Sequence, residues 1–265
     1  MSSSDAEGQL LIDEPAPHVA RLVISNPGKR GALDQAILDR FTETLPALDA
    51  RCLIITGRDT TFSAGYDIGD LPARDPTPAA EQLVAHPFAA ALDALEAYPY
   101  PTIAALNGHT IGGGLELALS CDLRIASSQI KLAMPPAKLG LVYSHTGIRK
   151  FIDTIGAPRT RELFFTARTI DAATAAAWGL VNALFEPEQL SDEALLLATT
   201  IAANAPLSQT GNKRVIAAVL AGQAALAPDV ERELLKLRSD CFSSDDFREG
   251  VRAFAEKRAP EWKGR

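Results

Sequence analysis

Residues 112–114 are three consecutive glycines that lie immediately before an apolar helical pattern at residues 115–120. Glycine is about 1 kcal/mol less favourable than alanine within a helix, so three together are expected where the backbone needs a positive φ or approaches a ligand closely. The first turn of a helix also presents unpaired amides and about half a positive charge. The segment therefore predicts a site for an anion, including one that exists only in a transition state.

Glu116 lies one turn beyond Gly113, on the same face of the expected helix. It is a candidate for chemistry at the anion site, and equally a helix-start carboxylate that the helix dipole stabilises. The glycines lack the Gly-x-Gly-x-x-Gly spacing, so a dinucleotide-binding fingerprint is not indicated.

Two other segments combine small or rigid residues with a polar group. Residues 62–68 follow an expected strand, and the Ala64-Gly65 pair could expose the amide of Tyr66; the alternative is a plain strand-to-helix turn. In residues 134–143 two consecutive prolines exclude a helix and predict a rigid loop. That loop leads to Tyr143, whose hydroxyl needs a partner among apolar neighbours, although an ordinary core tyrosine has the same need.

Several other kinds of chemistry are excluded. The four histidines and three cysteines show no metal-ligand spacing, and neither a nucleophile elbow nor a Walker phosphate loop occurs. A net charge of −7 has the wrong sign for a protein that neutralises nucleic-acid phosphates. An odd number of cysteines, widely spaced in apolar patterns, indicates a reducing compartment. Without a signal sequence or a long apolar run, we expect a cytoplasmic protein.

Short apolar runs and amphipathic patterns predict the elements that position these segments. Strands are expected at residues 18–24, 51–56, 102–106, 122–126, 130–133 and 180–184. Asp34 is expected to cap a helix that Pro46 ends or kinks. Later helices are expected at residues 158–167, 171–178, 190–203, 207–220, 228–241 and 244–258. The fold class is therefore α/β, with a core over residues 1–200 and a helical segment over residues 201–265.

Taken in order, these segments resemble the crotonase superfamily, the enoyl-CoA hydratase/isomerase family. The resemblance is carried by residues 26–33, 62–67, 107–116 with Cys121-Asp122, and 250–258. It implies a spiral core of ββα units and a C-terminal helical segment for oligomerisation. It also implies an acyl-CoA substrate, a homotrimer or hexamer, and no cofactor beyond the coenzyme A of the substrate. Neither nucleic acid nor a membrane is an expected partner.

The resemblance also implies roles for individual residues. The amides of Tyr66 and Gly113 would form an oxyanion hole around the thioester carbonyl, with Glu116 and Tyr143 as further catalytic groups. The implied CoA- and substrate-binding residues are Lys29, Arg30, Ala32, Leu33, Ala64, Asp67, Ile68, Gly112, Pro136 and Lys257, the last contributed by a neighbouring subunit.

Within the superfamily, hydratases use two glutamates; Glu116 matches the first, but Pro136 occupies the second position. The methylmalonyl-CoA decarboxylase subgroup lacks that second glutamate, and the sequence resembles it most through residues 62–72, 74–76 and 134–143. There, the tyrosine matching Tyr143 orients the substrate carboxylate. Those decarboxylases often carry histidine where Tyr66 stands, but only its main-chain amide is needed.

Three hypotheses follow. The leading one is decarboxylation of methylmalonyl-CoA-like substrates; the second is an enoyl-CoA hydratase or related lyase that uses Glu116 alone. The third is a non-catalytic CoA-binding or RNA-associated scaffold, and the acidic net charge argues against RNA.

Overall fold

The computed structural model describes residues 8–67, 86–222, 228–258 and 260–261. The expected Pro-rich loop at residues 71–78 and the predicted binding residue Ile68 lie outside these ranges.

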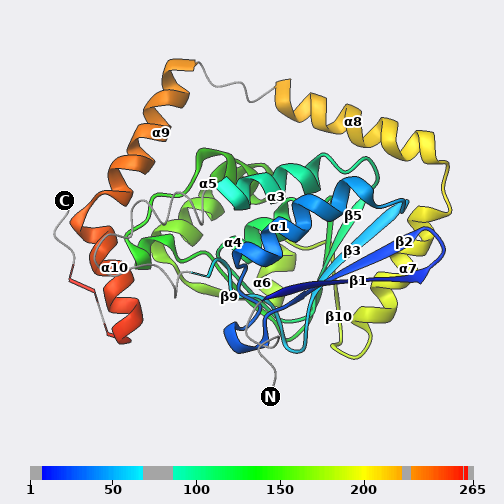
Figure 1. Cartoon of the computed structure of the whole chain (residues 1–265), viewed down its shortest axis with the longest axis horizontal. Coiled ribbons are helices and arrows are strands. Elements are labelled where there is room, and N and C mark those ends of the chain that lie inside the picture. The colour runs from blue at the N-terminus through cyan, green and yellow to red at the C-terminus, as the bar shows by residue number, and fades with distance from the viewer. Residues whose placement is uncertain (1–7, 68–85, 223–227, 259, 262–265) are drawn as a thin grey trace.

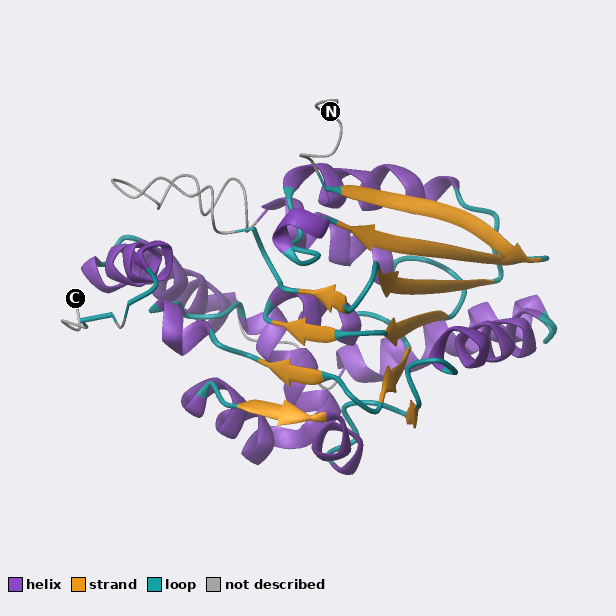
Figure 2. Ribbon diagram, turned by 90° about the horizontal axis from the view of Figure 1, so that it is seen from below, coloured by secondary structure: helices purple, strands orange, loops and turns teal. Residues whose placement is uncertain are grey.

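A six-stranded sheet forms the centre of the molecule (Figure 1; Figure 2). Its strand order is β1 (Gln9–Ala16), β2 (Val19–Ser25), β3 (Cys52–Gly57), β5 (Thr102–Leu106), β7 (Leu123–Ser127) and β10 (Ala183–Phe185). β1 and β2 pair antiparallel, and every other neighbouring pair is parallel. Five of these strands match the apolar runs in the sequence; β1 was not predicted.

A second sheet of four short strands follows the order β4 (Thr61–Ser63), β6 (His109–Ile111), β8 (Lys131–Ala133) and β9 (Thr169–Asp171). β4, β6 and β8 each come directly after a long strand of the first sheet, and β4 and β6 lead on to α3 (His86–Glu96) and α4 (Gly113–Leu119). The chain therefore repeats a strand–strand–helix unit, which confirms the predicted crotonase-like α/β fold.

Apolar side chains fill both faces of the large sheet. One cluster lies among the sheet and several helices, and its largest fully buried side chains include Phe41, Phe62 and Phe151. A smaller cluster joins the opposite face to α7 (Leu190–Ala202). Cys52 and Cys121 are buried as free thiols, and burial raises the pKa of each to about 12. Their thiols are therefore protonated and unreactive.

Side-chain caps fix where several helices begin. Asp34 accepts from the amide of Ile37 at 3.0 Å and starts α1 (Gln35–Thr44), as predicted. Asp171 and Ser244 cap α6 (Ala172–Ala177) and α10 (Asp245–Glu256) in the same way. α5 (His145–Thr166) begins earlier than expected, and its path bends at Gly156, whose φ is +75°.

The Pro135-Pro136 segment corrects one expectation, because it includes a short helical turn and is not simply a loop. A 3₁₀ turn, η5, runs over Pro136–Leu139, with Pro136 as its first residue. Proline is tolerated there because the first helical amides have no intrahelical acceptor.

The chain ends in α8 (Pro206–Gly222), α9 (Pro228–Phe242) and α10, which lie along the periphery of the molecule (Figure 1). Lys213 ties α8 to the core through Asp122 at 2.8 Å and the carbonyl of Tyr100 at 3.0 Å. α10 packs against η5. The division of the chain near residue 200 stays a prediction. None of the helices in the described ranges has both the length and the apolarity needed to cross a bilayer.

Candidate active site

A cavity of about 880 Å³ opens between the core and the C-terminal helix. Its walls come from the loop at residues 28–32, the turn at residues 64–67, the start of α4, the stretch from Met134 to Tyr143, the end of α5, and α10 with the residues after it. The segments that the sequence singled out for chemistry therefore meet around one space.

Two glycine turns bring the backbones of Tyr66 and Gly113 together at this cavity. Gly65 has a φ of +93°, and a Cβ there would lie 2.8 Å from the Ile111 carbonyl oxygen and 3.1 Å from the Gly113 nitrogen. Gly112 has a φ of +55° at the N-cap of α4. Only glycine adopts these conformations and this close approach without strain, which explains the two glycine-rich motifs.

The amides near these turns are oriented by neighbouring hydrogen bonds. Leu33 donates its amide to the Gly65 carbonyl and accepts from the Asp67 amide, so the strand edge between them turns the Tyr66 amide away from Leu33. Gly113 is the first residue of α4, and within the described ranges its amide donates to no protein acceptor. Both residues line the cavity. This arrangement is suited to stabilising an oxyanion; the roles of the two amides stay predictions.

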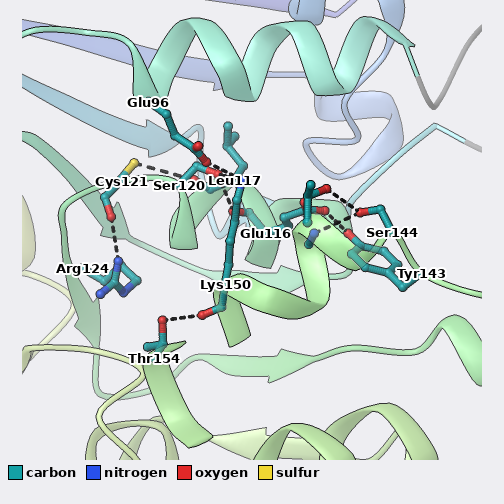
Figure 3. A network of polar contacts seen from close by, with 12 residues as sticks. Glu96, Glu116, Leu117, Ser120, Cys121, Arg124, Tyr143, Ser144, Lys150 and Thr154 are labelled. Carbon is teal, nitrogen blue, oxygen red and sulfur yellow. Dashed lines mark hydrogen bonds and ion pairs between the residues drawn. The ribbon is translucent and has the colours of Figure 1, made fainter. Parts of the chain in front are cut away.

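Glu116 does not line the cavity but lies behind Tyr143. Glu116 is 3% exposed, and Tyr143, which does line the cavity, donates its hydroxyl proton to Glu116 Oε2 (Figure 3). Glu116 is therefore linked to the cavity through its hydrogen bond with the Tyr143 phenol.

Gly147 in the first turn of α5 makes room for this pair. A Cβ at that position would lie 2.6 Å from Tyr143 Cε1 and 2.8 Å from Glu116 Oε1. Sequence reasoning missed Gly147; the only signal was a glycine just after a serine that could cap a helix. Ser144 is that cap and accepts from the Gly147 amide at 3.0 Å.

The pKa of Tyr143 lies well above its ordinary value of 10.0. Burial is the largest cause, and the negative charge of Glu116 and the neighbouring Tyr66 add to it. Tyr143 is therefore a neutral phenol over the physiological pH range and can act as a hydrogen-bond donor or acceptor.

The predicted binding residues divide into three groups. Those that line the cavity are Lys29, Arg30, Ala32, Ala64, Asp67, Gly112 and Pro136. Leu33 is 2% exposed and supports the turn from beneath. Lys257 ends α10 in a left-handed conformation and is not among the described lining residues.

Two cationic residues that line the cavity are paired within the chain. Lys29 Nζ lies 2.5 Å from Asp67 Oδ2. Arg258, one residue beyond Lys257, lines the cavity and donates to Glu249 at 2.6 Å. Together with the Glu261 amide and Arg252, it holds the pKa of the Glu249 carboxyl well below its usual range. Sequence reasoning did not predict Arg258 or Phe254 as lining residues, although both lie in the C-terminal motif.

The described residues contain no cluster of three or more histidine, cysteine or acidic side chains placed to hold a metal ion. The polar groups at the site include backbone amides, the phenols of Tyr66 and Tyr143 and the buried Glu116 carboxylate. The charged lining residues are Lys29, Arg30, Asp67, Lys138 and Arg258.

Comparison with known proteins agrees with this geometry. The family model described as enoyl-CoA hydratase/isomerase matches residues 15–265. A probable enoyl-CoA hydratase of Mycobacterium leprae is 33% identical over 92% of this chain and 94% of its own length. The methylmalonyl-CoA decarboxylase of Escherichia coli is 32% identical over 89% and 91%. A methylmalonyl-CoA decarboxylase solved in complex with 2-nitronate-propionyl-CoA superposes with a TM-score of 0.88 and 29% identity, over 97% of this chain and 98% of that one. The chain belongs to the enoyl-CoA hydratase/isomerase family.

Proposed function

We propose that the protein is an acyl-CoA lyase that decarboxylates methylmalonyl-CoA-like thioesters through an enolate. The observation that carries this proposal is the scarcity of bases at the cavity. Among the described lining residues the only carboxylate is Asp67, which is paired with Lys29. Pro136 lines the wall at the position where the resemblance places the second glutamate of hydratases. Loss of CO₂ from a malonyl-type thioester needs no base.

The two glycine turns supply the main catalytic contribution in this mechanism. The thioester carbonyl accepts from the amides of Tyr66 and Gly113, and its oxygen becomes negative as the bond to CO₂ breaks. One such donor is worth about 2.7–4 kcal/mol in comparable oxyanion sites. The helix dipole of α4 favours the same developing charge.

Tyr143 orients the carboxylate that leaves. Tyr143 and Pro136 both line the cavity, and the Tyr143 hydroxyl donates to Glu116. To hold a substrate carboxylate, the phenol turns its single proton from Glu116 to the substrate. A substrate carboxylate held there, out of the thioester plane, has its breaking bond aligned with the carbonyl π system. The largely apolar walls favour the charge-dispersed transition state over the localised carboxylate.

A second candidate, hydration of an enoyl-CoA, is supported by the direction of the Tyr143–Glu116 bond. Because Tyr143 donates to the carboxylate, Glu116 can accept a proton through the phenol and so help to activate water. The relatives do not choose between the candidates, since they include both hydratases and a decarboxylase.

In this proposal coenzyme A is the part of the substrate by which the protein binds it, and the reaction requires no other cofactor. The cationic lining residues Lys29, Arg30 and Arg258 are suited to its phosphates. We place the protein in the cytoplasm, which its buried free thiols support, as a homotrimer or hexamer.

Mass spectrometry of CoA thioesters after incubation with malonyl-, methylmalonyl- and crotonyl-CoA tests the proposal. The expected result is propionyl-CoA and CO₂ from methylmalonyl-CoA. Hydration of crotonyl-CoA without any CO₂ release would transfer the assignment to the second candidate. Turnover of none of the three would support the binding-only hypothesis.

A further inference from the structure

The side chain of Tyr66 has no role in the reaction just described, which uses only its amide. Its ring lies against the backbone of Gly113, because a Cβ built there would be 3.2–3.3 Å from the ring's Cε1, Cε2 and Cζ atoms. Phe88, which is 3% exposed, packs edge-on against the same ring with centroids 4.5 Å apart. The phenol is therefore held at the predicted oxyanion site by contacts on two sides.

The Tyr66 phenol also lies near the Tyr143–Glu116 pair. The neighbouring Tyr66 contributes to the raised pKa of Tyr143, and Tyr143 donates its single proton to Glu116. Both tyrosines line the cavity.

Both candidate reactions produce a thioester enolate that must gain a proton at its α-carbon. An enolate oxygen bound by the amides of Tyr66 and Gly113 places that carbon beside Gly113, where the Tyr66 ring lies. A phenol, with an ordinary pKa of about 10, is a much stronger acid than the α-carbon of a thioester, so this proton transfer is favourable.

We propose that Tyr66 is a catalytic acid whose phenolic proton is delivered to the α-carbon of the enolate. The proposal rests on the enolate chemistry of the proposed function, but it does not depend on whether loss of CO₂ or addition of water forms the enolate.

The transfer balances at the enolate. The O–H bond of Tyr66 breaks, the enolate electron pair forms the new C–H bond, and the thioester carbonyl is restored. A proton from water then restores the Tyr66 hydroxyl. In decarboxylation this is the one proton that the overall reaction consumes.

Exchange of the α-hydrogens of propionyl-CoA in D₂O tests the proposal, because exchange is the reverse of the proposed step and requires no decarboxylation or hydration. We expect wild-type protein to exchange them, measured as a mass increase, and Tyr66→Phe to exchange them about 10²–10⁴-fold more slowly. Tyr100→Phe is the matched control, since it removes a half-buried phenol hydroxyl outside the cavity. It should exchange at the wild-type rate.

A histidine at the same position separates acid catalysis from a structural role. Tyr66→His is expected to restore part of the exchange, with a pH profile that breaks near the ordinary imidazole pKa of about 6.5. Thermal unfolding and propionyl-CoA binding of each variant identify any loss of fold. Unchanged exchange in Tyr66→Phe, or a wild-type protein that binds propionyl-CoA without exchanging it, overturns the proposal. Exchange that depends on Tyr66, without CO₂ release from methylmalonyl-CoA, supports the proposal and overturns only the decarboxylase assignment.

Discussion

Glu116 is the residue at which the two candidate reactions differ. Hydration uses it as a proton acceptor through Tyr143, whereas breaking the bond to CO₂ does not require a base. In Glu116→Gln the amide oxygen can still accept from Tyr143, so the phenol keeps its position. We expect crotonyl-CoA hydration to fall about 10²–10⁴-fold and methylmalonyl-CoA decarboxylation by no more than roughly tenfold.

Loss of enone absorbance and release of CO₂ report the two activities of Glu116→Gln. The matching variant Glu43→Gln removes an exposed carboxylate on α1 that is not among the described lining residues, and it should leave both activities unchanged. A decarboxylation rate that falls as steeply as hydration would contradict this separation of roles.

Tyr143 gives a prediction about pH. Its pKa is raised above 10.0 because burial and Glu116 disfavour the phenolate. The neutral phenol is therefore present throughout the range below pH 10. Its contribution to the stability of the folded protein is complete below that pH and is lost only as the pH rises through the raised pKa. We expect no loss of kcat from ionisation of Tyr143 below about pH 9. An alkaline fall below that pH that disappears in Tyr143→Phe would show that the phenol ionises earlier.

At the scale of elements, the first turn of α5 sets the distance between Tyr143 and Glu116. Gly147→Ala would place a Cβ within 2.8 Å of both side chains. Overpacking of this kind costs about 1–3 kcal/mol. Because it displaces the catalytic phenol, we expect kcat to fall more than the affinity for propionyl-CoA.

The control for Gly147→Ala is Gly211→Ala on α8, where a Cβ would meet nothing within 4 Å. Alanine is favoured over glycine inside a helix by up to about 1 kcal/mol, so this variant should be unaffected or slightly stabilised in thermal unfolding. Steady-state kinetics that change equally in both variants would rule out a specific role for the α5 turn.

The elements also show what sequence can and cannot predict. Apolar runs predicted β2, β3 and β5, because buried parallel strands are continuously hydrophobic. β4, β6 and β9 are three residues long and were not predicted. β8 and β10 are equally short, but they overlap the longer apolar runs at residues 130–133 and 180–184. The glycine motifs predicted the two turns, because positive φ is a local property. The Tyr143–Glu116 pair spans 27 residues and depends on how α5 packs against α4, which no local pattern encodes.

At the scale of the whole molecule, the C-terminal helices differ in what they contact: α10 lines the cavity, whereas α8 exposes apolar side chains at the surface. Phe254 of α10 and Arg258, two residues beyond its end, line the cavity of their own chain. α8 instead exposes Leu207, Val215, Ile216 and Val219, with exposed fractions of 57% to 88%. Burying one such side chain contributes about 1.5–3 kcal/mol. Several of them exposed on one helix are the reason we predict association between copies of the chain.

We expect the protein to run at three or six times its 28.2 kDa chain mass in light scattering, and Val219→Lys to shift it toward the monomer. A lysine ammonium buried in an apolar contact lacks a partner and opposes association. Thr42→Lys adds the same charge at an exposed position on α1 and should leave the mass unchanged. A monomeric wild-type protein would contradict the association.

Dissociation by Val219→Lys also tests where Lys257 acts. The residues just after α10 already supply Arg258 to the cavity of the same chain, so a monomer that keeps α10 in place keeps that charge. If Lys257 completes the CoA site of a neighbouring subunit, the dissociated variant should show a raised KM for CoA thioesters. Its kcat should be nearly preserved, because the amides of Tyr66 and Gly113 and the Tyr143 side chain remain together in one chain. If Lys257 acts only within its own chain, dissociation should leave KM unchanged, and Lys257→Ala should raise KM equally in the monomer and in the assembled protein.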